Sequence, residues 1–272
     1  MGTCKDPALT YLNNDGYNVV RVPRAGIEPL DVLGRDGKSI EKLGSLTEVW
    51  TSTEGPPKAA DPEPASSITG QKTQSLDLGI GLKLLAGVLS GMGTGVGLPS
   101  LQFNYKSSHS VEFKFVDVYS VSVTAFALGK YLAHGSLDLA NPVAQAYFGN
   151  EETEEYVITD VLKSNSVSVT AKTDSGTDVT LDLPTIQNMV GANVTVKAGT
   201  GSSGELVYQG KNQLTFGFKV FQTFYENGAW RVRGVQAAGD LAFGGSSGGG
   251  AEEVVGQPML LNPGGMIRFR QL

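Results

Sequence analysis

The sequence predicts an α+β fold, in which helices flank a central, twisted antiparallel β-sheet. Three stretches, 111–125, 167–183 and 214–232, alternate apolar and polar residues over lengths beyond the usual strand of about five or six residues. Gly-containing turns interrupt the second and the third, as they do in antiparallel hairpins. The mixed segment 128–156 is expected to hold one or two helices. A β-sandwich would satisfy the same alternation.

Composition excludes several classes of function. The 272 residues carry a net charge of −6, which argues against nucleic acid as a partner because phosphate binding needs clustered Lys and Arg. A single cysteine excludes an internal disulfide framework and suits a reducing compartment. The start shows neither the basic stretch nor the apolar run of a secretory signal. We therefore expect a cytoplasmic protein.

The first quarter of the chain is expected to form short strands and a loop. Residues 9–50 mix turn residues with short apolar runs, which is typical of short strands. The segment 54–67 is rich in Pro, Ala and acidic residues and is expected to be an exposed loop.

The next segment fits two periodicities at once. Alternate apolar residues predict a half-buried strand, and these are Leu76, Leu78, Ile80, Leu82 and Leu84. Helical spacing predicts one apolar helix face instead, made by Leu78, Leu82, Leu85 and Leu89. Both interpretations stay open, including a segment that is helical in one state and extended in another. The glycine-rich 91–99 lacks the Lys-Ser/Thr of a phosphate-binding loop and is expected to be a turn or linker.

Two blocks of long strands follow. In the first, Asp117 interrupts the alternation as a bulge would, and the apolar side holds Val111, Phe113, Phe115, Tyr119, Val121 and Val123. The second is expected to contain three hairpins, turning near 174–176, 199–204 and 226–228. Its apolar positions are Val167, Val169, Val179, Leu181, Leu214, Phe216, Phe218 and Val220. A strand needs only about 9–11 residues to cross a bilayer, so these strands are long enough to do so.

The C-terminal end differs in kind from the rest. Residues 243–253 form a Gly/Ser-rich linker, and 258–272 is an apolar tail that is expected to dock on its own domain. The expected docking residues are Met259, Leu260, Leu261, Met266, Ile267 and Phe269. A tethered peptide docks at high effective concentration, and cutting the tether removes this advantage. Both a proteolytic switch and a simple extra docked strand fit this pattern.

A protease would reach the linker and its flanks most easily. This region is marked by Leu241, Phe243, Gly244 and Gly256. Arg233 would suit a trypsin-like protease but lies in or near an expected strand, where access is poor. From residue 241 to the end, two Glu and two Arg cancel, so the tail is net neutral. We therefore expect it to mask the core by apolar docking and steric block rather than by charge.

No catalytic or metal-binding motif is present. The sequence lacks G-x-S-x-G, H-E-x-x-H, C-x-x-C and Walker patterns, and neither His109 nor His134 has partners at metal-ligand spacing. We expect neither an enzyme nor a metal protein, although a hydrolase whose site assembles only in three dimensions stays open. The other alternative is a soluble β-rich binding or structural protein without lytic activity.

Taken together, these features resemble a known family. The start, CKDPALTYLNNDGYNVVRVPRAGIEPL (4–30), resembles the N-terminal signature of bacterial gasdermins, and the two β blocks and the short tail agree in order and length. The resemblance extends over essentially the whole chain and is most specific over residues 4–34. It implies a gasdermin-like pore-forming core (1–240), a protease-accessible linker (241–257) and an autoinhibitory peptide (258–272).

The resemblance also implies a mechanism. A caspase-like or trypsin-like protease, encoded nearby, would remove the tail. The core would then insert in the inner membrane and refold with other copies as a large transmembrane β-barrel, killing the cell in antiphage defence. Each β block would supply one pair of crossing strands, at about 70–128 and about 156–226. Cys4 matches the position that carries a palmitoyl group in the family, and no other cofactor is expected.

Overall fold

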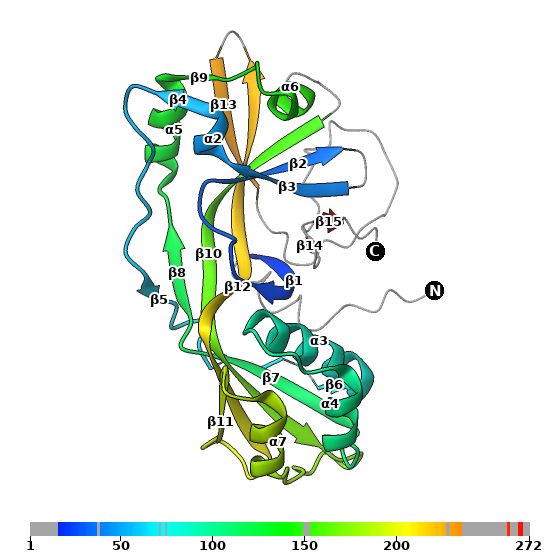
Figure 1. Cartoon of the computed structure of the whole chain (residues 1–272). Helices are drawn as coiled ribbons and strands as arrows, with labels where there is room; N and C mark the ends of the chain where they lie inside the picture. Colours follow the sequence, from blue (N-terminus) through cyan, green and yellow to red (C-terminus); the bar gives the residue numbers. More distant parts are fainter. Residues whose placement is uncertain are drawn as a thin grey trace, which may run out of the picture.

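The computed structural model describes residues 16–36, 39–70, 72–73, 75–148, 153–226, 229–235, 260–261 and 266–268. Two long strands form its spine, β10 (Thr153–Lys172) and β12 (Glu205–Glu226), which pair antiparallel from Glu155↔Thr223 to Thr170↔Glu205 (Figure 1). The fold is therefore α+β with an antiparallel core, as the alternation predicts.

The lower half in Figure 1 is an antiparallel sheet covered by helices. β7 (Ser110–Val116) pairs with β10, and β11 (Val194–Ala198) pairs with β12. The covering helices are α3 (Leu78–Gly91), α4 (Leu98–Asn104) and α7 (Leu183–Val190). The two-residue strand β6 (Leu76–Asp77) pairs with β7 and leads into α3, whose N-cap Asp77 accepts the N–H of Gly79 at 2.9 Å.

The upper half holds the remaining strands and helices. β1 (Asn18–Arg24) pairs with β12, and β2 (Asp31–Asp36) pairs with both β10 and β3 (Ser39–Ser45). A two-stranded sheet, β4 (Trp50–Ser52) with β9 (Gly135–Leu137), lies beside α5 (Ala125–Ala133). The other elements are α2 (Leu46–Val49), α6 (Pro142–Phe148) and β13 (Ala229–Val235), which pairs with β12.

The first β block is shorter than the sequence predicts. Asp117 takes a positive φ of 52° and divides it into β7 and β8 (Tyr119–Ser122), which agrees with the predicted bulge. Thr124 then caps α5 through the N–H of Ala127, so the strand ends where the alternation still continues. The exposed strand β5 (Glu63–Pro64), in the predicted loop, pairs with β8.

One of the three predicted hairpins forms only as a single antiparallel bridge, Lys172↔Asp178. After the turn at 173–176, Val179 donates its N–H to the carbonyl of Ala171, but neither Val179 nor Leu181 belongs to a strand. Asp182 instead caps α7, with Pro184 in the first turn. An Asp-x-Pro sequence is a helix-start signal, and it outweighs a five-residue alternation. The hairpins β11–β12 and β12–β13 form as predicted.

A bulge also breaks the predicted apolar side of β12. The register jumps from Leu162↔Gly217 to Lys163↔Thr215, so Phe216 has no partner on β10. Phe216 therefore stacks on Phe115 at a centroid distance of 4.0 Å, whereas Phe218 belongs to a separate buried cluster. The four predicted apolar residues are all buried, but they do not share one face. They are Leu214, Phe216, Phe218 and Val220.

Candidate functional site

The strands β10 and β12 are longer than a strand needs to be to cross a bilayer. Their 20 and 22 residues extend about 66 and 73 Å at about 3.3 Å per residue, against about 30 Å for the hydrocarbon core of a bilayer. Each strand therefore has enough residues for a membrane-crossing part and for a part that stays in water.

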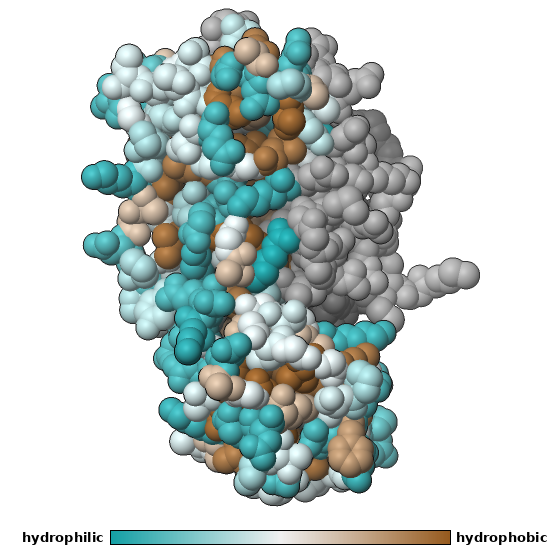
Figure 2. Space-filling model, in the orientation of Figure 1, coloured by the Kyte–Doolittle hydropathy of each residue, from teal (hydrophilic) through white to brown (hydrophobic). Residues whose placement is uncertain are grey.

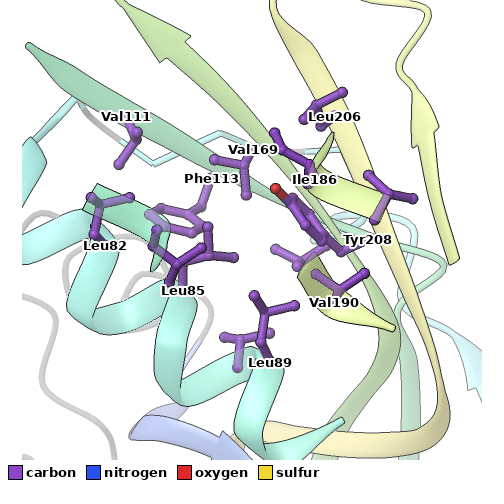
Figure 3. Close-up of a cluster of buried hydrophobic side chains, with 14 of the residues drawn as sticks. Leu82, Leu85, Leu89, Val111, Phe113, Val169, Ile186, Val190, Leu206 and Tyr208 are labelled. Atoms are coloured by element: carbon purple, nitrogen blue, oxygen red, sulfur yellow. The ribbon is translucent and has the colours of Figure 1, made fainter. Parts of the chain in front are cut away.

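One face of the lower sheet is apolar and covered. Figure 3 shows Leu82, Leu85 and Leu89 of α3 directed toward the sheet, and Ile186 and Val190 of α7 beside them. The sheet side of this buried cluster is formed by Val111, Phe113, Val167, Val169, Ala171, Leu206 and Tyr208. The helices thus keep from water a set of strand residues that alternate with polar ones. If the helices left, this face would be exposed and apolar.

The helix α3 lies unusually close to β7. A Cβ on Gly81 would stand 2.0 Å from Cγ2 of Val111, a buried β-branched side chain with little rotameric freedom. We expect Gly81→Ala to destabilise the protein by about 1–3 kcal/mol, because the clash outweighs the gain in helix propensity of about 1 kcal/mol. Gly129→Ala on α5, where nothing lies within 4 Å, should instead stabilise by about 0.5–1 kcal/mol. Urea unfolding measures the change in the free energy of unfolding for both variants. If the two changes had the same sign, this would contradict the close packing of α3 on β7.

The opposite face of the same sheet is polar. Lys114 of β7 forms an ion pair of 2.5 Å with Glu205 of β12, across Ser168 of β10, whose hydroxyl also donates to Glu205. The N–H of Gly201 donates to the same carboxylate at 2.7 Å. Glu205 is only 3% exposed, so this cluster is a buried, fully bonded polar contact. Lys114 stands between the predicted apolar positions Phe113 and Phe115, so the alternation puts it on the polar side of the strand, whereas no sequence pattern singles out Glu205.

A second buried polar pair lies within the apolar cluster. The hydroxyls of Tyr105, after α4, and Tyr208 of β12 are 2.6 Å apart and both side chains are fully buried. One hydroxyl donates a hydrogen bond to the other, which links the helical cover to the strand beneath it. Sequence patterning could not find this pair, because the two residues are 103 positions apart.

The described tail residues complete a closed ring of strands. β14 (Leu260–Leu261) pairs in parallel with β1, through Val19↔Leu260 and Val20↔Leu261. β15 (Met266–Arg268) pairs antiparallel with β3 and also with β14. The pairing then runs β10-β12-β1-β14-β15-β3-β2 and returns to β10. We call β14 and β15 the C-terminal strand pair. If this pair were absent, β1 and β3 would each have an unpaired edge.

The structure describes some of the predicted membrane-strand and docking residues as helix, some as strand, and does not describe the others. Leu76 lies in β6, and Leu78, Ile80, Leu82 and Leu84 lie in α3, so this segment is helical here and only its helical periodicity applies. Backbone pairing is described for Leu260, Leu261, Met266 and Ile267. Seven of the predicted site residues lie outside the described residues, namely Cys4, Leu241, Phe243, Gly244, Gly256, Met259 and Phe269.

Over the ranges that the structure covers, no helix has both the length and the apolar character to span a membrane. Within the same ranges, His, Cys, Asp and Glu form no group that could hold a metal ion.

Glu155 is a buried carboxyl at the end of the β10–β12 pair. It is 5% exposed and accepts a hydrogen bond of 3.1 Å from the hydroxyl of Thr153. Burial, reinforced by the neighbouring charge of Glu154, raises the pKa of Glu155 from 4.5 to about 7. The folded state therefore binds this proton more tightly than the unfolded state does.

This raised pKa predicts a pH-dependent stability. The contribution of Glu155 is most favourable below pH 4.5 and is lost as pH rises through about 7. At pH 8 we expect Glu155→Gln to stabilise the fold by up to about 3 kcal/mol, and at pH 4.5 by close to nothing. Thermal unfolding at both pH values tests this, with the exposed Asp61→Asn as the matched control. An equal gain at both pH values would contradict the assignment.

Sequence comparison finds clear relatives. The model of the Bacterial Gasdermin Family matches residues 20–229. A gasdermin bGSDM of Vitiosangium sp. (strain GDMCC 1.1324) is 39% identical over 98% of both chains. One of a Desulfuromonadales bacterium is 36% identical over 84% of this chain and 85% of the relative.

Structure comparison finds the same fold. A bacterial gasdermin from Bradyrhizobium tropiciagri matches with a TM-score of 0.61, covering 84% of this chain and 90% of the other. Its sequence identity is 19%, so this match supports the fold alone.

Proposed function

This chain belongs to the bacterial gasdermin family, whose members are pore-forming effectors and not enzymes, and from this premise we propose that it is an autoinhibited pore-forming protein. Proteolytic removal of the C-terminal tail would free the core. Freed cores would then insert in the membrane, assemble as a large homo-oligomeric β-barrel and kill the cell in antiphage defence.

The observation that carries the proposal is the ring of strands closed by the C-terminal strand pair. Because β14 and β15 bridge β1 and β3 through backbone pairing, a cut in the linker would turn an intramolecular contact into a bimolecular one. A peptide held by five described residues would then dissociate at cellular concentrations. Its loss would leave two open strand edges that another copy can pair with.

The two-faced lower sheet supports the same proposal. In a closed barrel, only alternate residues need be apolar, because closure satisfies every backbone amide. The covered face with Val111, Val169 and Leu206 would contact lipid, and the face with Lys114, Ser168 and Glu205 would line the lumen. For this, α3 and α7 must leave the sheet, and α3 has the alternation that an added strand needs.

The remaining parts of the proposal concern partners and location. The activating partner would be a caspase-like or trypsin-like protease encoded nearby, cutting within 241–257. Arg233 lies in β13, where a protease has poor access. The protein would stay cytoplasmic until cleaved and then act at the inner membrane. A palmitoyl group on Cys4 would add membrane affinity of about 0.8 kcal/mol per buried methylene.

Dye leakage from vesicles tests the proposed function. We expect the full chain, with a site for a specific protease inserted in 243–253, to release dye only after cleavage. The same chain without protease and the unmodified chain with protease are the controls. Vesicles that remain sealed after complete cleavage would favour the alternative, a soluble β-rich protein without lytic activity.

Salt should not replace the protease. The tail from residue 241 is net neutral and its described residues are held by backbone pairing, which salt screens little. We expect leakage from the uncut chain to change less than twofold between low salt and 1 M NaCl. Strong leakage at high salt without cleavage would show that charge, and not strand pairing, holds the tail.

A further inference from the structure

Among the described strands, β11 is the last on its side of the lower sheet, and a helix side chain closes its outer edge. This side chain is Gln187 of α7. Its Nε2 donates to the carbonyl of Val194 at 3.0 Å, and its Oε1 accepts the N–H of Val196 at 2.7 Å. The same Nε2 also donates to the carbonyl of Gly191, at the end of α7, at 3.1 Å. The amide therefore binds β11 as the backbone of a neighbouring strand would.

The pairing of β11 with β12 shows which backbone groups face outward. In an antiparallel ladder, alternate residues turn their N–H and C=O toward the partner strand, and the residues between turn them away. The N–H of Gly199 donates to the carbonyl of Glu205 at 2.7 Å, in continuation of this register. The odd-numbered residues of β11 therefore face β12, and Val194, Val196 and Ala198 face outward. The amide binds in this outward row.

The opposite edge of the lower sheet is closed in a similar way. Beside β7, the hydroxyl of Thr73 accepts the N–H of Phe113 at 2.9 Å, and the N–H of Thr73 donates to the carbonyl of Phe113 at 2.8 Å. The hydroxyl of Thr69 accepts the N–H of Val118 at 3.1 Å. Side chains thus take the place of a strand backbone at both edges. Open edges allow chains to associate, and native proteins block them.

We propose that Gln187 prevents the chain from pairing, edge to edge along β11, with a second copy of itself in water. The edge is self-complementary. Antiparallel pairing centred on Val196 would place Val194 opposite Ala198 of the second copy, and each such pair of outward residues can exchange two backbone hydrogen bonds. Thr195 would stand opposite Lys197, so no like charges would meet. Val and Thr also favour strands.

The surroundings of this edge do not oppose such pairing. From Leu183 to Gly204 the chain contains no Asp or Glu and only one Lys. Figure 2 shows apolar residues among polar ones on the visible surface of the lower half. The charge of −6 on each copy is screened at 0.15 M salt, where the Debye length is about 8 Å. The hydrogen bonds of Gln187 are therefore what competes with a second copy.

Sedimentation velocity of the uncut chain, without lipid or protease, tests this inference, which goes beyond the proposed function. Gln187→Met keeps the length of the side chain but removes the amide. Each of the two bonds to β11 is worth about 5-fold, so we expect this variant to dimerise about 25-fold more tightly than the wild type. Gln187→Ser, too short to reach β11 and without added apolar surface, should dimerise as well. Gln145→Met, at an exposed glutamine on α6, should change association less than twofold.

A proline on the same edge separates strand pairing from general damage. The N–H of Ala198 faces outward, so Ala198→Pro leaves the pairing with β12 intact but blocks the approach of a second copy. Added to Gln187→Met, it should restore the monomer. Association that persists with the proline would assign the contact to another surface and overturn the proposal.

Three other results would also overturn it. The first is a Gln187→Met chain that stays monomeric. The second is association of Gln187→Met but not of Gln187→Ser, which would assign the effect to the added apolar side chain. The third is loss of the cooperative thermal transition in both variants, which would show that Gln187 holds the fold rather than the edge. None of these results bears on leakage after cleavage, and sealed vesicles would not bear on the dimer.

Discussion

A full-length chain carrying Ile267→Pro should release dye from vesicles without any protease. Ile267 pairs on one side with Leu261 and on the other with Ile40, so it lies inside the ring. Proline has no N–H and cannot complete a ladder with neighbours on both sides. Losing one such hydrogen bond costs about 1–3 kcal/mol, which raises the population of open chains by about 5- to 150-fold. Leakage from the uncut variant should rise by a similar factor.

The matched control for this variant is Ile267→Val, which keeps the N–H and a β-branched side chain. It should leave the uncut chain as inactive as the wild type. Suppose that vesicles stay sealed with uncut Ile267→Pro and yet leak with the cleaved wild type. This result would show that inhibition does not depend on the pairing of β15. A variant that fails to fold would reveal itself by losing the cooperative thermal transition.

Lys114→Met should be among the most destabilising substitutions in the lower half. It leaves the carboxylate of Glu205, 3% exposed, with only Ser168 and the N–H of Gly201 as partners. Removing one member of a buried ion pair costs about 3–5 kcal/mol, because the other charge stays desolvated. We expect the melting temperature to fall by about 6–20 °C. Lys83→Met, an exposed lysine on α3, should change stability by about 0.5 kcal/mol or less.

A second substitution separates the ion pair from general damage to the strand. Glu205→Gln on the Lys114→Met background removes the orphaned charge, and should recover more than half of the lost stability. If the double variant is no more stable than Lys114→Met, the loss comes from packing around residue 114. Urea unfolding of the four chains in the cycle gives the coupling energy.

The long strands could be predicted because their signal is local. In β7 and β10, Val111, Phe113, Val167 and Val169 alternate with polar residues and do lie on one buried face. The turns at 199–204 and 226–228 likewise join strands that pair with each other. The family could be recognised from residues 4–34, although the first twelve of these lie outside the described residues.

Short alternating segments were ambiguous for a physical reason. Val179 and Leu181 satisfy a period of two over only a few residues, and the cap at Asp182 decides for a helix nearby. The leucines of α3 satisfy two periods, and contact with Val111 and Phe113 selects the helical one. In each case, a neighbour distant in the sequence or a single capping residue outweighs the periodicity.

The sequence by itself determined the class of fold, the alternating strands and the apolar tail, because side-chain period and turn residues act within a few positions. Only the tertiary structure decided which strand edges the tail would join, and that Lys114 and Glu205 would meet across β10. Nearly every residue has the same backbone donor and acceptor, so the sequence of a strand does not specify which strand it pairs with. The path of the whole chain brings Val19 beside Leu260, and with that contact the ring closes.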